Sequence, residues 1–140
     1  MATENKQTHH LYSYFRSTCT NRAVIAMHLK ARSLEFQALN PSKFVPVLVI
    51  KDYDGNETVI TQSIAILEFL EESLPTLTPL LPPSGDLVQR AQVREMVNVI
   101  TNDIQPITNG RIAKRVRAIR GDAKDQISFV TDVFLAGLTV

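Results

Sequence analysis

The sequence has few cysteines, no tryptophan and almost no net charge, which are features that often indicate a class of protein. It contains one cysteine, no tryptophan and a formal net charge of only +1 in 140 residues. A single cysteine excludes an intramolecular disulfide and favours a reducing compartment, so we expect a cytosolic protein. The near-neutral charge argues against nucleic acid as a partner. No apolar run approaches the roughly 20 residues of a membrane helix, and the polar start MATENKQTHH lacks a signal-peptide core.

Several motifs are also missing. The chain has no CxxC pair, no zinc-ligand spacing, no glycine-rich phosphate loop and no G-x-S-x-G element. Its three histidines are not spaced as metal ligands, so we predict no metal site. We expect His9 and His10 to be solvated, because they lie near a terminus. A composition of 44% hydrophobic and 21% charged residues is that of an ordinary globular protein.

A strand-to-helix corner holds the only cysteine. LYSYF at 11–15 predicts a strand, and a helical pattern follows from Thr20 to about Arg32. The segment between them carries Ser17, Thr18 and Cys19, and its hydroxyl residues are good helix N-caps. Unpaired N–H groups and the positive end of the helix dipole gather at such a corner and stabilise an anion, including a thiolate.

Two interpretations of this corner stay open. In one, a hydroxyl donates to a thiolate, which belongs either to Cys19 or to a ligand. In the other, the hydroxyls only cap the helix and the cysteine is a small, half-buried side chain nearby.

The middle of the chain predicts a hairpin between two helical segments. SLEFQALN at 33–40 is a short helical candidate, and VPVLVI at 45–50 is a β-branched strand. A polar turn containing Asp54–Gly55 leads to TVI at 58–60, which closes the hairpin. The following helix has Ser63 as its predicted N-cap and ends at Pro75.

Two short segments of this region have alternative interpretations. A trans proline that enters a strand is the default for Val45–Pro46, whereas a cis bond would leave the backbone of Val45 free for a peptide-like ligand. Gln62 and Ser63 precede a helix, where they either cap it or hold a ligand carboxylate with help from the dipole.

The second half predicts helices. The proline-rich stretch 76–85 is an expected linker, and we place the domains at 1–82 and 83–140. Asp86 opens a long helix with Gln89 three residues later, and Pro106 should bend or stop it. A final helix is expected from about Asp122. Two apolar stripes are predicted to be buried, at Val93, Val97, Ile100 and Ile104 and at Ile112, Val116 and Ile119. The basic run 111–120 predicts a solvated face, from which one or two arginines could line an anionic substrate site.

Three segments in this order resemble a known family. A strand running into S-[ST]-C-x-x-R, then NPxxxVPxLxI, then ITQSxAIxEFLEExxP, is similar to the zeta class of glutathione transferases, also called maleylacetoacetate isomerases. The stretches PLLPP, RAxVR and DIQPxxN extend the resemblance over the chain from Leu11 onward. It implies an α/β thioredoxin-like N-terminal domain followed by an all-α C-terminal domain.

The resemblance also implies a glutathione site. Ser17 and Thr18 would donate to the glutathione sulfur, with Cys19 in a supporting role. Val45, before a cis Pro46, would pair with the cysteinyl backbone of glutathione. The remaining implied contacts are Gln62 and Ser63 at the γ-glutamyl end, and Gln105 and Asn109 from the helical domain.

The implied activity is glutathione-dependent cis–trans isomerisation of maleylacetoacetate, a step of tyrosine and phenylalanine breakdown, with glutathione transferase activity beside it. The implied partners are glutathione, a small anionic substrate and a second copy of the chain in a homodimer. Two alternatives remain: a non-catalytic glutathione-binding or dimerisation module, and a thiol transferase that uses Cys19 itself.

Two gaps separate the sequence from the family pattern. LKARSLEFQALNP joins the first helix almost directly to the VP segment, so the second strand of the family is missing and the first strand should have an exposed edge. The chain ends at Val140, inside the second long helix of the C-terminal domain. We therefore expect a splice variant, a truncated gene model or a fragment, with an incomplete N-terminal domain, a truncated helical domain and reduced or absent activity.

Overall fold

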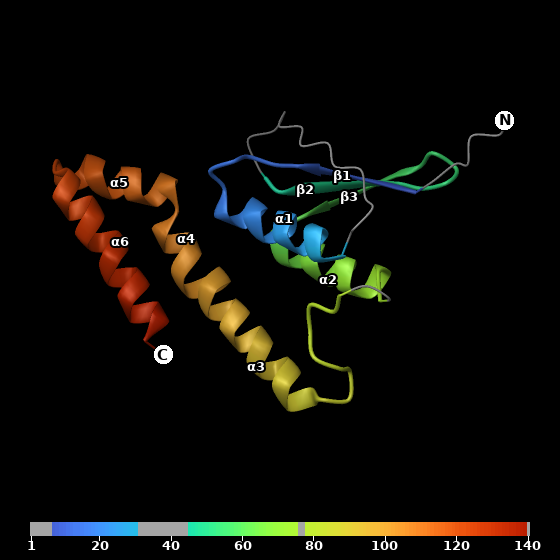
Figure 1. Cartoon of the computed structure of the whole chain (residues 1–140). Coiled ribbons are helices and arrows are strands. Elements are labelled where there is room, and N and C mark those ends of the chain that lie inside the picture. Colours follow the sequence, from blue (N-terminus) through green and yellow to red (C-terminus); the bar gives the residue numbers. More distant parts are fainter. Residues whose placement is uncertain (1–6, 31–44, 76–77, 140) are drawn as a thin grey trace. The chain divides into compact units, whose positions relative to one another are not determined.

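The chain divides into two compact units. The structure, a computed structural model, describes residues 7–30, 45–75 and 78–139. The first unit is Met1–Leu81 and the second is Pro82–Val140, with the division inside the predicted linker (Figure 1). The predicted helix at 33–40, and the segment from which a strand is expected to be missing, lie outside the described residues.

The first unit contains an antiparallel sheet. Its strands are β1 (Thr8–Tyr12), β2 (Val47–Lys51) and β3 (Glu57–Thr61). Among the described residues they follow the order β1-β2-β3, so β1 is an edge strand, as predicted. β1 ends well before residue 15, so the bounds predicted for the first strand are wrong. The residues after it turn toward the first helix through a hydrogen bond from the Ser17 N–H to the Tyr14 carbonyl, at 2.9 Å.

His9 is buried in this sheet, so the expectation of a solvated pair is wrong for it. Alternate residues of a strand face opposite sides, and His9 shares the covered face of β1 with Leu11. Only 5% of His9 is exposed, and its ring centre lies 6.2 Å from that of Phe69. Burial, with a smaller effect from the charge of His10, lowers the pKa of His9 below its usual value.

The predicted hairpin is confirmed. β2 and β3 pair from Val47↔Thr61 to Lys51↔Glu57. The Asp52 carboxylate accepts hydrogen bonds from the N–H groups of Asp54 and Asn56 at 2.9 and 2.8 Å, which closes the turn. Gly55 has φ 85°, a left-handed conformation that glycine adopts without steric cost.

Two helices cover one face of the sheet (Figure 1). They are α1 (Thr18–Lys30) and α2 (Ser63–Ser73), which pack against each other. Their small and apolar side chains meet those of the strands in one core, which joins the helix layer to the sheet. The buried members are Leu11, Ala23, Ala26, Met27, Leu48, Ile50, Ile66 and Leu70.

A buried cation joins the ends of these two helices. Lys30, the last residue of α1, is only 1% exposed, and its ammonium lies 2.6 Å from the Glu71 carboxylate in α2. It also donates to the Leu74 carbonyl at 3.2 Å. Glu71 in turn accepts from the N–H groups of Leu80 and Leu81, at 2.9 and 3.4 Å. One ion pair therefore ties α1, α2 and the segment after α2 together.

The second unit begins with one long helical run. The Asp86 carboxylate accepts from the Gln89 N–H at 3.0 Å and caps α3 (Leu87–Asn98), as predicted. The run continues through the π-helix η1 (Val99–Ile104) into α4 (Gln105–Thr108). Pro106 lies at the start of α4 and does not stop the run, which continues to Thr108.

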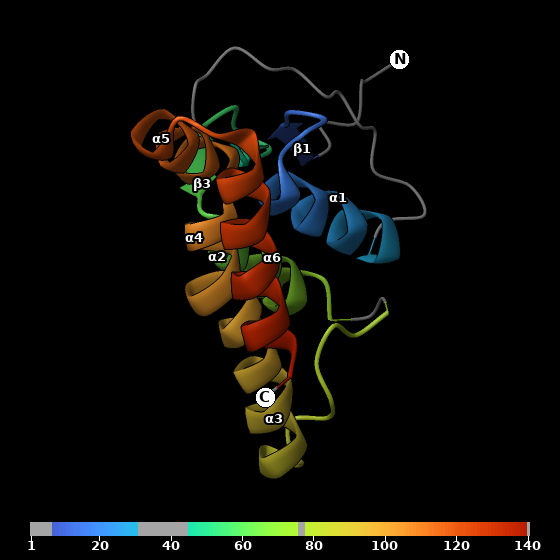
Figure 2. The ribbon, with the colours of Figure 1, turned by 90° about the vertical axis from the view of Figure 1, so that its left-hand side faces the viewer.

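The last two helices fold back on this run. α5 (Gly110–Arg120) and the predicted final helix α6 (Ala123–Leu138) pack together, and α6 runs alongside η1 and α4 (Figures 1 and 2). Asp122 caps α6 by accepting from the Lys124 N–H at 2.8 Å. The cations of the basic run are all exposed, as predicted, and Arg120 pairs with Asp125 at 2.7 Å.

The predicted apolar stripes are only partly buried. Ile104 is buried, but Ile100 is 45% exposed and Ile119 is 67% exposed, so both are corrections. Ile100 lies in η1, where the wider i→i+5 turn moves side chains off the face that a regular α-helix would present. Ile119 lies in the last turn of α5, away from the side on which Ala113 is buried.

Ile104 fits against a glycine of α6. A Cβ added at Gly137 would collide with the side chain of Ile104, whereas one added at Gly110 would meet nothing within 4 Å. The close approach of α6 to η1 therefore requires a residue without a side chain at 137.

The ion pair predicts an acid-sensitive contribution to stability. Burial raises the pKa of Glu71, but the hydrogen bonds from Lys30, Leu80 and Leu81 lower it more, so the pKa lies below the ordinary 4.5. This contribution is complete above pH 4.5 and is lost as the pH falls through the folded pKa. Glu71→Gln should lower the free energy of unfolding in urea at neutral pH by about 3 kcal/mol, because Lys30 stays buried without a counterion.

The matched control is Glu72→Gln, at an exposed position of the same helix, which should change the free energy of unfolding by less than about 0.5 kcal/mol. The difference between Glu71→Gln and the unchanged chain should shrink in acid. Equal effects of the two substitutions would contradict the role given to Glu71.

The glycine contact predicts a second difference in stability. Gly137→Ala should destabilise the second unit by about 1–3 kcal/mol, because the new methyl group overlaps Ile104. Gly110→Ala, in open space, should be neutral or slightly stabilising. Thermal unfolding of both variants measures the two effects, and similar midpoints would show that α6 does not pack as described.

Candidate functional site

The sheet brings the three segments singled out in the sequence to one of its ends. The last residue of β1 pairs with the first of β2, Tyr12↔Val47, and that residue pairs with the last of β3, Val47↔Thr61. The chain leaves this end toward Ser17, enters it at Pro46 and leaves it again at Gln62. Residues distant in sequence thus surround one end of the sheet.

Ser17 caps α1. Its hydroxyl oxygen accepts a hydrogen bond from the Thr20 N–H at 3.2 Å, and its carbonyl accepts from the Asn21 N–H at 3.0 Å. Since a hydroxyl accepts through its oxygen and donates through its proton, capping leaves the proton available for a ligand. The two interpretations of this corner are therefore compatible, because Ser17 can cap the helix and donate at the same time.

The neighbours of Ser17 lie in the first turn of α1. Thr18 is the first residue of the helix and is exposed. Cys19 follows as a free, half-buried thiol. Both lie at the positive end of the helix dipole, where an anion is stabilised.

The Val45–Pro46 peptide bond is cis. The trans proline taken as the default is therefore wrong, and the cis proline implied by the family resemblance is confirmed. Pro46 is buried and Val45 is half-buried. Because β2 begins only at Val47, Val45 lies before the first residue pair of the ladder.

The N-cap residue predicted for α2 is wrong. Gln62, not Ser63, is the N-cap residue, with φ 73° and ψ 123° and no side-chain capping bond. Ser63 is the first helical residue, is 6% exposed, and accepts a hydrogen bond at 3.1 Å from the Arg22 guanidinium. The positive φ of a non-glycine residue costs about 1–3 kcal/mol, and such strain concentrates at functional sites.

Two contacts align α1 and α2 in the same direction. Arg22 reaches Ser63 at the start of α2, and Lys30, eight residues further along α1, reaches Glu71, eight residues further along α2. The helices therefore run side by side with their N-termini at the same end. The positive ends of two dipoles converge there, beside the cis Pro46 turn, which favours an anionic ligand.

Sequence reasoning missed Arg22 as a member of this site. The residue stands in the S-[ST]-C-x-x-R segment, but nothing in the local pattern says which partner its side chain reaches. That partner is 41 positions away in the chain.

The two remaining predicted residues belong to the second unit. Gln105 is half-buried and begins α4 directly after η1. Asn109 caps α5, because its side-chain carbonyl oxygen accepts from the N–H groups of Arg111 and Ile112 at 3.0 and 3.1 Å. Its amide group donates to the Pro106 carbonyl at 2.5 Å. Asn109 therefore has a local structural role, and its predicted contact with a ligand stays a prediction.

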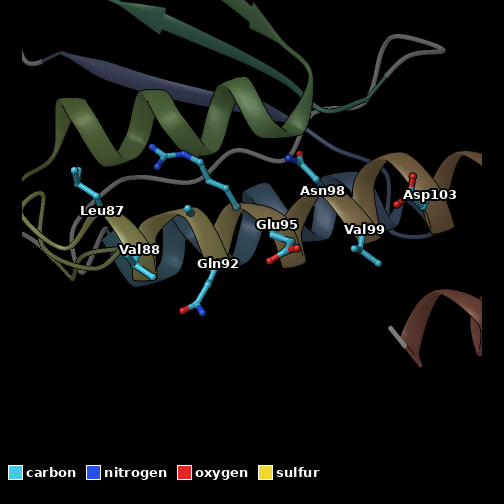
Figure 3. Close-up of a pocket in the computed structure, with 9 residues that line it drawn as sticks. Leu87, Val88, Gln92, Glu95, Asn98, Val99 and Asp103 are labelled. Atoms are coloured by element: carbon cyan, nitrogen blue, oxygen red, sulfur yellow. The ribbon is translucent and has the colours of Figure 1, made fainter.

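Other kinds of site find little support in the described part of the chain. A hollow follows α3 and η1 from Leu87 to Asp103 (Figure 3), but none of the predicted site residues lines it. No cluster of histidine, cysteine and acidic side chains in residues 7–30, 45–75 and 78–139 is placed to hold a metal ion. None of the helices described there is long and apolar enough to cross a membrane.

Comparison with known proteins agrees with this geometry. Residues 23–73 match the family described as "Glutathione S-transferase, N-terminal domain". A probable glutathione S-transferase of Coccidioides immitis is 43% identical over 136 residues, which are 80% of this chain and 58% of that protein. A maleylacetoacetate isomerase of Emericella nidulans is 39% identical over 145 residues, with coverages of 91% and 62%.

A solved structure extends the likeness to the fold. The crystal structure of maleylacetoacetate isomerase from Anaeromyxobacter dehalogenans 2CP-1, with bound GSH in the active site, superposes with a TM-score of 0.81 at 31% identity. The match covers 96% of this chain and 66% of that one. The chain belongs to the glutathione transferase family.

The family explains the two-part fold. The first unit is a thioredoxin-like glutathione transferase N-terminal domain with a three-stranded sheet among its described residues, and the second is a helical C-terminal region. The resemblance to the zeta class is confirmed by the relatives called maleylacetoacetate isomerases. The chain spans 58% and 62% of the length of the two curated relatives above.

The strain at Gln62 predicts that replacing this residue with glycine raises the stability of the fold but weakens ligand binding. Gln62→Gly should raise the free energy of unfolding by up to about 1 kcal/mol, because glycine adopts positive φ without a clash. The same change removes the carboxamide and should weaken binding of an anionic ligand. Urea unfolding measures the first effect, and a destabilised Gln62→Gly would show that the backbone is not strained here.

Proposed function

We propose that this chain binds glutathione at the end of the sheet where α1 and α2 begin. The observation that carries the proposal is the convergence of the two helix N-termini beside the cis Pro46 turn. Glutathione presents a thiolate, a peptide backbone and carboxylates, and the site offers a matching partner for each. This fit supports glutathione as the cofactor, in keeping with the GSH-bound relative.

Most of the predicted site residues have a role in this proposal. Ser17 donates its free hydroxyl proton to the sulfur, and exposed Thr18 stands beside it as a second donor. Val45 pairs through its backbone with the cysteinyl part of the ligand. The γ-glutamyl end lies against Gln62 and Ser63 at the N-terminus of α2. The family resemblance adds Gln105 and Asn109 to the proposed ligand contacts.

The proposed reaction is the cis–trans isomerisation of maleylacetoacetate, as named for the relatives. Bound glutathione supplies a nucleophilic thiolate that adds reversibly to an activated double bond. Ser17 and the dipole of α1 keep that sulfur ionised and hold it in place. Backbone N–H groups at the helix N-termini and nearby arginines offset the charge that develops on the anionic substrate.

Three further predictions stay part of the proposal. They are a role in tyrosine and phenylalanine breakdown, a cytosolic location, and a homodimer. The homodimer is supported by the exposed apolar side chains of α3, among them Leu87, Val88 and Met96.

A second candidate is binding without turnover. The capping role of Asn109 favours it, because that side chain already has partners within its own unit. The free thiol of Cys19 in the first turn of α1 would suit the third candidate, a thiol transferase.

Two substitutions at the corner separate these functions. Ser17→Ala should lower isomerase turnover about 100-fold, because it removes a hydrogen-bond donor to the reacting sulfur. Cys19→Ser should keep turnover within about threefold, since a second hydroxyl replaces a thiol that does not react. The measurement is turnover of maleylacetoacetate with glutathione, beside a disulfide-exchange assay.

The opposite pattern would identify Cys19 as the nucleophile and a thiol transferase as the function. Glutathione that raises the midpoint of thermal unfolding without any turnover would identify a binding module. An unfolding midpoint that glutathione leaves unchanged would contradict the proposed site.

A further inference from the structure

We propose that Arg22 is a positioning residue that prepares the site for the γ-glutamyl carboxylate of glutathione. It holds the Ser63 hydroxyl in a donating orientation and places a positive charge at the start of α2. The inference rests on the proposed function and adds to it a residue and the ligand group on which that residue acts.

The hydrogen bond between the two side chains orients Ser63. The Arg22 guanidinium can only donate, so in their 3.1 Å contact the Ser63 oxygen is the acceptor. The hydroxyl proton of Ser63 must then point to a different acceptor. Since Ser63 is 6% exposed and begins α2, its proton is held at the helix N-terminus, where a carboxylate is stabilised.

Lys30 provides a comparison within the same helix. Arg22 and Lys30 both reach from α1 to α2, one at each end of the contact. Lys30 is neutralised by the Glu71 carboxylate, whereas Arg22 forms no ion pair with any carboxylate of residues 7–30, 45–75 and 78–139. The guanidinium therefore keeps its charge for an anion that arrives from outside, at the end where the ligand is expected.

A purely structural tie between the helices is the competing explanation. It predicts that loss of Arg22 lowers the affinity of the site for every ligand by the same factor, because the helices that form the site would no longer be held in place. Action on one carboxylate predicts instead that only ligands carrying that carboxylate are affected.

The experiment measures two Kd values by isothermal titration calorimetry with the full 140-residue chain. One ligand is glutathione, and the other is γ-aminobutyryl-cysteinyl-glycine, which is glutathione without the γ-glutamyl carboxylate. Arg22→Gln should bind glutathione about tenfold more weakly, since hydrogen bonds to charged groups are strong. The same variant should bind the analogue within about twofold of the unchanged chain, because the group on which Arg22 acts is missing.

Two more variants sharpen the comparison. Ser63→Ala should likewise weaken glutathione more than the analogue. Adding Arg22→Gln to Ser63→Ala should cost less affinity than Arg22→Gln alone, because only the effect of the Arg22 charge is left to lose. Arg22→Lys keeps the charge and should recover part of the affinity for glutathione. The matched control is Lys51→Gln, which removes one positive charge at the far end of the hairpin and should change neither Kd.

Equal losses for both ligands, or no loss for either, would overturn the role of Arg22 while leaving the proposed function intact. An unchanged chain that binds no glutathione would overturn both. If Arg22→Gln does not unfold cooperatively, Arg22→Lys takes its place, and its loss of affinity must then be confined to glutathione.

Discussion

The parallel alignment of α1 and α2 is the constraint on which the rest of the first unit depends. Lys30 holds the two C-terminal ends together through Glu71 and is itself almost completely buried. A charge in that position is stable only when it is paired and hydrogen-bonded, so the ion pair specifies which helix faces meet. The same carboxylate fixes Leu80 and Leu81, where the first unit ends.

The candidate site follows from this alignment. Parallel helices place both positive dipole ends at one end of the pair, an arrangement that an anion stabilises. The strand register brings the cis Pro46 turn to the same end, and Gln62 carries backbone strain there. Stability and function are thus coupled. The buried Lys30–Glu71 pair at one end of the helices holds them together, and the charge of Arg22 and the strained backbone of Gln62 lie at the other end.

The second unit shows where periodicity is a sufficient guide and where it is not. The cap at Asp86 and the start of the last helix near Asp122 could be predicted, because a capping side chain bonds to N–H groups two or three residues away. Exposure of Ile100 could not, since it depends on a π-helix whose wider turn leaves no simple mark in the sequence. The contact between Gly137 and Ile104 could not be predicted from the sequence either, because the two residues lie in different helices.

The sequence by itself determined the order of the elements that the structure describes, the hairpin and the three polar segments of the candidate site, because these depend on neighbours within a few residues. It also carried the family likeness, through motifs whose order is more specific than any one of them. Only the tertiary structure showed that His9 is buried and that Arg22 reaches Ser63, and it decided between the cis and trans interpretations of Pro46. The physical reason is that each of these depends on which surfaces meet across the fold, and contacts between distant residues have no local signature in the chain.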